Sequence, residues 1–157
     1  MTHPTPEETA AWQKRLAAQA NNRAWALAEA LTRTPEEDEE MLQAAHAAMH
    51  FWKIVGDAGN RAHAAQLVAH VYALLGLPNP ARHYLKQSQP HFLDRECAPW
   101  ELAFAHAVAA NVAAAAGDHA SHARHYRQAE QCVAALADAE DREILGATMR
   151  VIPVPKG

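Results

Sequence analysis

Apolar residues recur at helical spacing along the chain. After Asn60 they share one arc of about 120° when each residue advances the helical wheel by about 100°. The residues on this arc are Ala64, Leu67, Val68, Val71, Leu74 and Leu75. In the stretch 35–55, the residues that align in the same way are Met41, Ala45, Ala48, Trp52 and Val55. Each stretch is therefore predicted to be an amphipathic helix that packs against a neighbour.

Short motifs mark where helices begin and end. The tetrapeptide Thr-Pro-Glu-Glu occurs at residues 5–8 and again at 34–37. In each copy threonine can cap a helix, proline occupies the first helical position, and the second glutamate can complete a capping box. Glycine and proline divide the rest of the chain. The helices are predicted near 6–32, 35–55, 60–76, 79–89, 98–116 and 119–138, with a short seventh near 139–149 and an extended tail after it. Connections this short favour antiparallel hairpins.

Composition supports an all-α fold. Half of the 157 residues are apolar, only 6% are aromatic, and alanine dominates. Alanine has the highest helix propensity and lets helix axes approach closely, whereas the β-branched residues that sheets favour are scarce. The length suits a single domain with one core. We therefore expect one all-α domain built from helical hairpins.

A second tetrapeptide, Ala-Arg-His-Tyr, occurs at 81–84 and again at 123–126. Both copies are predicted to open the second helix of a hairpin, and a turn glycine, Gly76 or Gly117, precedes each copy. The copies therefore indicate a helix-turn-helix unit used twice, at a spacing of 41 to 42 residues. On this interpretation alanine and tyrosine pack between helices, and arginine and histidine lie at the edges. A ligand site that is repeated with the unit is the alternative.

The unit at 65–88 has small, aromatic, turn and bulky residues at recognisable positions. These residues are Ala69, Tyr72, Gly76, Ala81, Leu85 and Ser88. In them the unit resembles the tetratricopeptide repeat family. The later unit matches at Ala110, Gly117, Tyr126 and Ala129. His122 falls where the motif has alanine, which suggests one inserted residue in that turn.

The resemblance implies a short right-handed superhelix of stacked hairpins. The domain would hold an atypical hairpin at 6–55, repeat-like hairpins at 60–89 and 98–138, and a terminal helix with its tail at 139–157. In such an array the first helix of each unit lines a concave groove that binds extended or helical peptide segments. The resemblance would place His63, Gln66 and His70 on this lining, with Asn111 in the equivalent region of the next unit. The alternative is that these are ordinary exposed polar residues.

The first helix contributes two further candidates. Arg23 lies among the apolar positions Trp12, Leu16, Ala20 and Leu27, and a buried arginine needs an acceptor. A carboxylate of this chain or the carboxylate of a ligand would serve. Trp25 lies on the opposite side of the helix. It is either a contact between hairpins or an exposed anchor for a partner.

Histidine is the sharpest feature of the composition, with 11 residues. His46 and His50 have the i, i+4 spacing that places two imidazoles on one helix face, as in helical zinc sites. Lys53 lies beside them, and a cation opposes metal binding. A histidine-rich metal centre built from His46, His50, His63 and His70 remains an alternative to a groove without any metal or cofactor.

Charge and motifs narrow the function classes. The chain has 18 acidic residues and 14 Lys and Arg, and no basic cluster stands out in the sequence. Nucleic-acid binding is therefore not expected. Cys97 and Cys132 lack metal-ligand spacing and are predicted to be reduced thiols. No apolar run approaches the roughly 18 residues of a membrane span, so a cytoplasmic protein is expected. Phosphate-binding loops and nucleophile motifs are absent.

These features lead to one functional expectation. The chain is predicted to be a non-catalytic interaction module, which binds a protein or peptide partner in its groove and has no cofactor. A homodimer is plausible. A weaker alternative has the tail, 151–156, fill the groove of its own chain.

Overall fold

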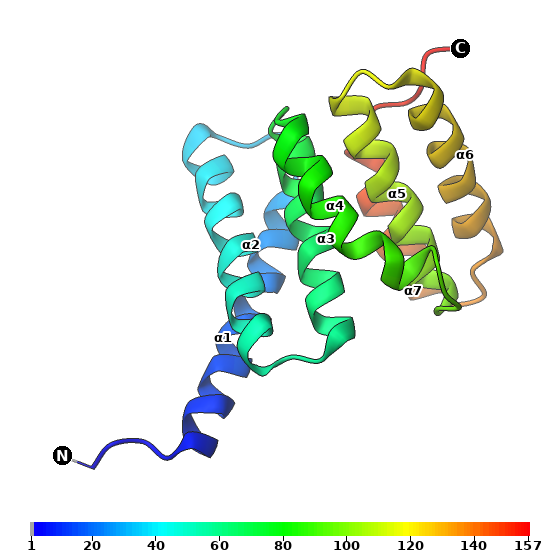
Figure 1. Cartoon of the computed structure of the whole chain (residues 1–157). Coiled ribbons are helices and arrows are strands. Elements are labelled where there is room, and N and C mark those ends of the chain that lie inside the picture. The colour runs from blue at the N-terminus through cyan, green and yellow to red at the C-terminus, as the bar shows by residue number, and fades with distance from the viewer. Residues whose placement is uncertain (1) are drawn as a thin grey trace.

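The computed structural model describes residues 2–157, and this part of the chain forms seven helices (Figure 1). They are α1 (Pro6–Ala28), α2 (Pro35–Val55), α3 (Ala58–Leu74), α4 (Pro78–Phe92), α5 (Pro99–Ala115), α6 (His119–Ala135) and α7 (Ala139–Arg150). Consecutive helices pack as the hairpins α1/α2, α3/α4 and α5/α6, and α7 packs against α5 and α6. The all-α fold of stacked hairpins is thereby confirmed.

The hairpins stack in series along the chain. The first helices contact one another in order, α1 with α3, α3 with α5, and α5 with α7. Each second helix also contacts the first helix of the next hairpin, because α2 touches α3 and α4 touches α5. The result is two layers of helices, with α1, α3, α5 and α7 in one layer (Figure 1).

The predicted capping boxes form at the starts of α1 and α2. The hydroxyl of Thr5 accepts the N–H of Glu8 at 3.1 Å, and the Glu8 carboxylate accepts the N–H of Thr5 at 2.8 Å. Thr34 and Glu37 make the same two bonds before α2. Asp57 and Asn60 form a third box, so α3 begins two residues earlier than the glycine pattern suggested.

The α3/α4 and α5/α6 hairpins share one register. Helix α5 begins and ends 41 positions after α3, and α6 begins 41 positions after α4. Gly76 and Gly117 adopt left-handed φ angles of 71° and 70°. Beside them, the N–H of Leu77 donates to the carbonyl of Tyr72 and that of Asp118 to the carbonyl of Ala113. Both helices therefore end in the same Schellman turn.

This register corrects the expectation of an inserted residue. His122 follows Gly117 at the same interval as Ala81 follows Gly76, and both His122 and Ala81 are buried. The two Ala-Arg-His-Tyr copies, 42 positions apart in the sequence, are thus one residue out of structural register. Tyr84 corresponds to His125 rather than to Tyr126. The shared tetrapeptide indicates that both hairpins are present, but its residues do not occupy equivalent positions in the two.

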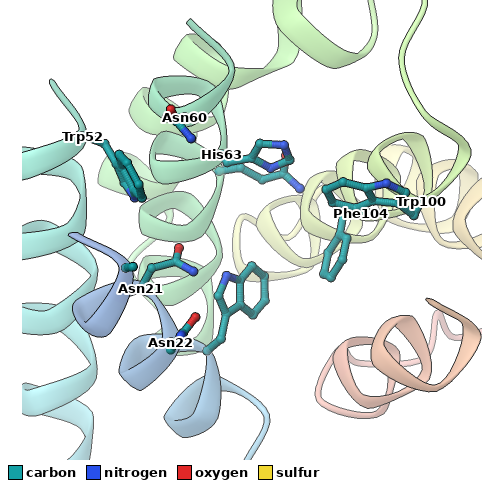
Figure 2. Close-up of a pocket in the computed structure, with 10 residues that line it drawn as sticks. Asn21, Asn22, Trp52, Asn60, His63, Trp100 and Phe104 are labelled. Carbon is teal, nitrogen blue, oxygen red and sulfur yellow. The ribbon is translucent and has the colours of Figure 1, made fainter. Parts of the chain in front are cut away.

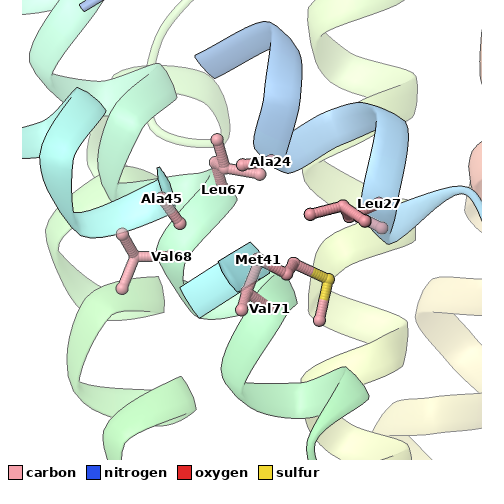
Figure 3. Packing of buried hydrophobic residues seen from close by; sticks show 8 residues of the cluster. Ala24, Leu27, Met41, Ala45, Leu67, Val68 and Val71 are labelled. Carbon is pink, nitrogen blue, oxygen red and sulfur yellow. The ribbon is translucent and has the colours of Figure 1, made fainter. Parts of the chain in front are cut away.

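The core is built from small and medium side chains. Around Met41 on α2, residues from α1 and α3 pack without exposed surface or nearly so (Figure 3). The members of this cluster are Ala24, Leu27, Ala28, Met41, Ala45, Leu67, Val68 and Val71. Further clusters join α3 to α5 and α5 to α6, and alanine is their commonest residue. Alanine lets the helix axes approach closely, as the composition suggested.

The first half of α1 differs from the prediction. Trp12 is 61% exposed and Leu16 is 42% exposed, although both lie on the predicted apolar face. The buried residues of α1 begin at Ala17, because its earlier turns project beyond the other helices (Figure 1). The helix also ends at Ala28, earlier than predicted.

The far end of the stack is closed by α7 and the tail. Ile152 is buried against Ala107, Ala110 and Ala129 of the last hairpin. The Nε2 atom of His122 lies 2.7 Å from the carbonyl oxygen of Pro153 and donates to it. The tail is thereby fixed to α5 and α6. No helix among residues 2–157 combines the length and the apolar character that crossing a membrane requires.

Candidate functional site

A cleft of about 300 Å³ opens where α1, α3 and α5 meet the end of α2 (Figure 2). Its lining residues are Ala18, Asn21, Asn22 and Trp25 of α1, Trp52 of α2, Asn60, His63 and Gln66 of α3, and Trp100 and Phe104 of α5. We call this the inner cleft. It lies among the first helices of the three hairpins, where the sequence predicted a groove.

Side-chain amides form the polar part of the inner cleft. Asn21 and Asn22 approach from α1, and Asn60 from α3 (Figure 2). Gln66 of α3 also lines the cleft. The Oδ1 atom of Asn60 accepts the N–H of Asp57 at 3.1 Å. An amide side chain offers both a donor and an acceptor, which is the combination that a peptide group needs.

Gln66 is the most constrained of these amides. Its side chain is buried, with only 3% of the residue exposed, yet it borders the inner cleft. Its Oε1 atom has no hydrogen-bond partner in the part of the chain that the structure describes. A buried acceptor without a donor costs roughly 1 to 3 kcal/mol. A turn of the side-chain amide would bring this oxygen to a donor on a ligand in the cleft and recover that free energy.

Aromatic rings form the apolar part of the cleft. Trp25 packs against Phe104, with ring centroids 5.3 Å apart. Trp100 meets the same phenyl ring edge-on at 6.2 Å. These contacts connect α1 to α5, so Trp25 is both a contact between hairpins and a wall of the cleft. The contact between hairpins is thereby seen, and a role of Trp25 as an anchor for a partner stays a prediction.

His63 stands at the rim between polar and aromatic parts. Its ring stacks on Trp100 at 5.4 Å, and its Nε2 atom lies 2.9 Å from Oε1 of Glu101. Burial alone would raise the pKa of Glu101, but hydrogen bonds from the Ala98 N–H and from His63 hold that pKa below its ordinary value. His63 thus lies on the lining of the inner cleft, and its part in binding a partner stays a prediction.

His70 and Asn111 do not line the cleft, contrary to the sequence prediction. His70 has no exposed surface and lies beneath Trp25, with ring centroids 5.5 Å apart. Asn111 is buried at the equivalent position of the next hairpin, and its amide donates to Nδ1 of His70 at 3.1 Å. Burial, with a smaller contribution from the charge of Arg33, lowers the pKa of His70 to about 4. The pair connects two hairpins.

Arg23 also has a structural place. Its guanidinium forms a two-pronged ion pair with Glu40, at 2.6 and 2.9 Å, and joins α1 to α2. The residue is exposed and lies outside the lining of the cleft. The acceptor is thus a carboxylate of this chain, and Arg23 is exposed rather than buried.

The four histidines of the metal alternative do not converge. The Nε2 atom of His46 lies 2.8 Å from the Tyr72 hydroxyl, His50 is exposed, and His70 is sealed beneath Trp25. Residues 2–157 hold no group of three or more His, Cys, Asp or Glu side chains placed to share a metal ion. The centre proposed from His46, His50, His63 and His70 is therefore not assembled.

The tail does not fill the cleft either. It packs on the last hairpin through Ile152 and contributes no lining residue. The sequence analysis also overlooked part of the site, namely Asn21, Asn22, Trp52, Trp100 and Phe104. The adjacent asparagines were a usable signal, because asparagine is a poor helix former and needs a reason to stand in the middle of a helix.

Comparison with known proteins adds no relative: no family model, no curated protein and no solved structure matches the chain significantly.

Proposed function

We propose that the protein is a non-catalytic interaction module whose inner cleft binds an extended segment of a partner polypeptide. The side chain of Gln66 carries this proposal, because it borders the cleft and its buried Oε1 atom has no donor among the described residues. A backbone N–H of an extended peptide supplies one. The hairpin stack and its two equivalent Schellman turns support the finer assignment to tetratricopeptide-like repeats.

The chemistry of the lining fits a peptide better than a charged small molecule. The neighbouring amides of Asn21 and Asn22 each offer a donor and an acceptor to successive peptide groups, and the NH₂ group of Asn60 offers a further donor. Trp25, Trp100 and Phe104 offer flat apolar surface for one side chain of the segment. Specificity for the sequence of the partner segment would come mainly from these aromatic residues. Whether the chain also forms a homodimer stays a prediction.

A displayed library of random peptides tests the proposal. Peptides selected on the folded protein are synthesised, and their affinities are measured by calorimetry. We expect Gln66→Leu to weaken binding about tenfold, since it removes one hydrogen bond to a buried acceptor. The same change should leave the free protein at least as stable, because leucine has no unsatisfied oxygen. If Gln66→Leu both unfolds and loses binding, the result does not support the proposal.

The control is Trp12→Ala on α1. Trp12 is exposed and does not line the cleft, so its removal should leave the affinity unchanged. If no peptide is selected, or if Gln66→Leu binds the selected peptides as well as the wild type does, the inner cleft is not a peptide site.

A further inference from the structure

Two further cavities lie on the side of α3 that faces away from the inner cleft. One, of about 640 Å³, is formed by α2, α3 and α4. The other, of about 440 Å³, is formed by α3, α4 and the segment after it. Arg61, Ala65 and Gln87 border both cavities, so the two meet along a common wall. We call them the paired pockets.

The charged groups of the paired pockets are all basic. Lys53, Arg61 and Arg95 line them, together with histidines that include His50, His83 and His91. No aspartate or glutamate is among the described residues that line either cavity. This is unexpected in a chain whose net charge is −4. Helices α2, α3 and α4 and the segment after α4 thus bring together basic residues that do not form one run in the sequence.

No ion pair among the described residues neutralises Lys53, Arg61 or Arg95. The ion pairs of residues 2–157 are Arg23–Glu40, Arg33–Asp38 and His63–Glu101, and none involves Lys53, Arg61 or Arg95. The carboxylate of Asp57 stands at the start of α3, but it caps that helix by accepting the N–H of Asn60 at 2.8 Å. Cations gathered without a counter-charge repel one another, and an anion between them removes that repulsion.

Arg61 is held in place at the junction. One of its guanidinium nitrogens donates to the carbonyl oxygen of Gly56 at 2.7 Å, which fixes the side chain against the turn between α2 and α3. The other guanidinium N–H groups remain for a ligand. An oriented guanidinium at the wall between two cavities suits a phosphate oxygen, since arginine binds phosphate by paired charge-assisted hydrogen bonds.

We propose that the paired pockets bind a small soluble anion with two phosphate groups, a pyrophosphate or a diphosphate ester. The two adjoining cavities share Arg61, and Lys53 lines one and Arg95 the other, so several cations surround a place for more than one phosphate charge. Tyr84 and Met49 in the larger cavity offer apolar surface for the organic part of an ester. A nucleic acid fits less well, because the acidic chain as a whole repels a long phosphate backbone.

Calorimetric titration of the whole protein with pyrophosphate tests this proposal. We expect saturable binding at one site, and orthophosphate should bind at least tenfold more weakly because it has less charge and fewer acceptor oxygens for Arg61 and its neighbours. Lys53→Ala and Arg61→Ala should each weaken the binding of pyrophosphate about tenfold or more. Lys86→Ala is the matched control, because Lys86 is exposed on α4 and lines neither cavity.

The two variants differ in their risk of misfolding. Arg61→Ala also removes the hydrogen bond to Gly56, whereas Lys53→Ala loses no hydrogen bond or ion pair within the described residues. If Arg61→Ala fails to fold, the affinity of Lys53→Ala for pyrophosphate therefore still tests the proposal. Absence of binding, equal binding by wild type and Lys53→Ala, equal affinity for orthophosphate, or tighter binding of a single-stranded oligonucleotide would each overturn the proposal. The inner cleft plays no part here, so Gln66→Leu should bind pyrophosphate like the wild type.

Discussion

The buried histidine beneath Trp25 should make the stability of the protein depend on pH. Burial lowers the pKa of His70 from its ordinary 6.5 to about 4. The unfolded chain then takes up a proton on this ring near pH 6.5, whereas the folded protein holds the ring neutral until about pH 4. Stability is therefore complete above the unfolded pKa and is lost as the pH falls through this window.

The size of the effect follows from the same pKa values. The whole shift corresponds to about 3 kcal/mol, since each pKa unit is worth about 1.4 kcal/mol. Between pH 7 and pH 5 the linkage relation gives a loss of about 2 kcal/mol. Other histidines with lowered pKa values, His46, His106 and His125, add to the total slope. The contribution of His70 must therefore be measured as a difference between two proteins.

His70→Gln provides that difference. Glutamine does not titrate, and its amide oxygen can still accept from Asn111. Urea unfolding followed by circular dichroism at pH 7, 6 and 5 should show that the wild type loses about 2 kcal/mol more than His70→Gln over this range. His119→Gln, which changes an exposed histidine, should retain the slope of the wild type.

Two results would refute this reasoning. One is a pH slope in His70→Gln equal to that of the wild type. The other is an NMR titration of the wild type in which the His70 ring protonates near pH 6.5, which requires no variant to fold.

Three further substitutions test the fold. Gly76→Ala should destabilise the protein by about 1 kcal/mol, because its φ of 71° disfavours any residue with a Cβ atom, although the space for that atom is open; unchanged stability in urea would contradict the Schellman turn. Gly146→Ala, inside α7 and also unobstructed, should raise stability by up to about 1 kcal/mol, and a lower urea midpoint would show that α7 is packed differently. Trp12→Ala should change the free energy of unfolding by less than about 0.5 kcal/mol, whereas a large loss would place the start of α1 in the core.

Local signals in the sequence predicted the helices well. Capping boxes and the turn glycines are local, so each start at Pro6 and Pro35 and each turn at Gly76 and Gly117 could be read directly. Boundaries failed where tertiary contacts outweighed a local signal. Helix α4 continues through Pro90 as far as Phe92, whose buried ring packs against α3 and α5. A proline in the last turn loses one hydrogen bond, and the burial of Phe92 offsets that loss.

The register of the repeat could not be read from identical letters. The Schellman turns set the register at 41 residues, and within it His122 takes the place of Ala81. A histidine is larger than an alanine, and it fits there because the tail provides the carbonyl of Pro153 as its acceptor. The tail is distant in sequence, so the compensation that permits the substitution was not visible in the motif itself.

The sequence also could not indicate which residues of the candidate site a ligand can reach. The resemblance implied that His63, Gln66 and His70 line one groove, but it did not indicate how deeply each residue along α3 is buried. At His63 the groove side of α3 faces the open cleft, at Gln66 it is nearly closed, and at His70 it is covered by Trp25. What covers it comes from α1, in the hairpin that carries no repeat signature. The hairpin α1/α2 therefore determines how much of the α3 face a ligand can reach. Gln66 lies between the covered and the open part of that face, and its Oε1 atom has no hydrogen-bond donor among the described residues.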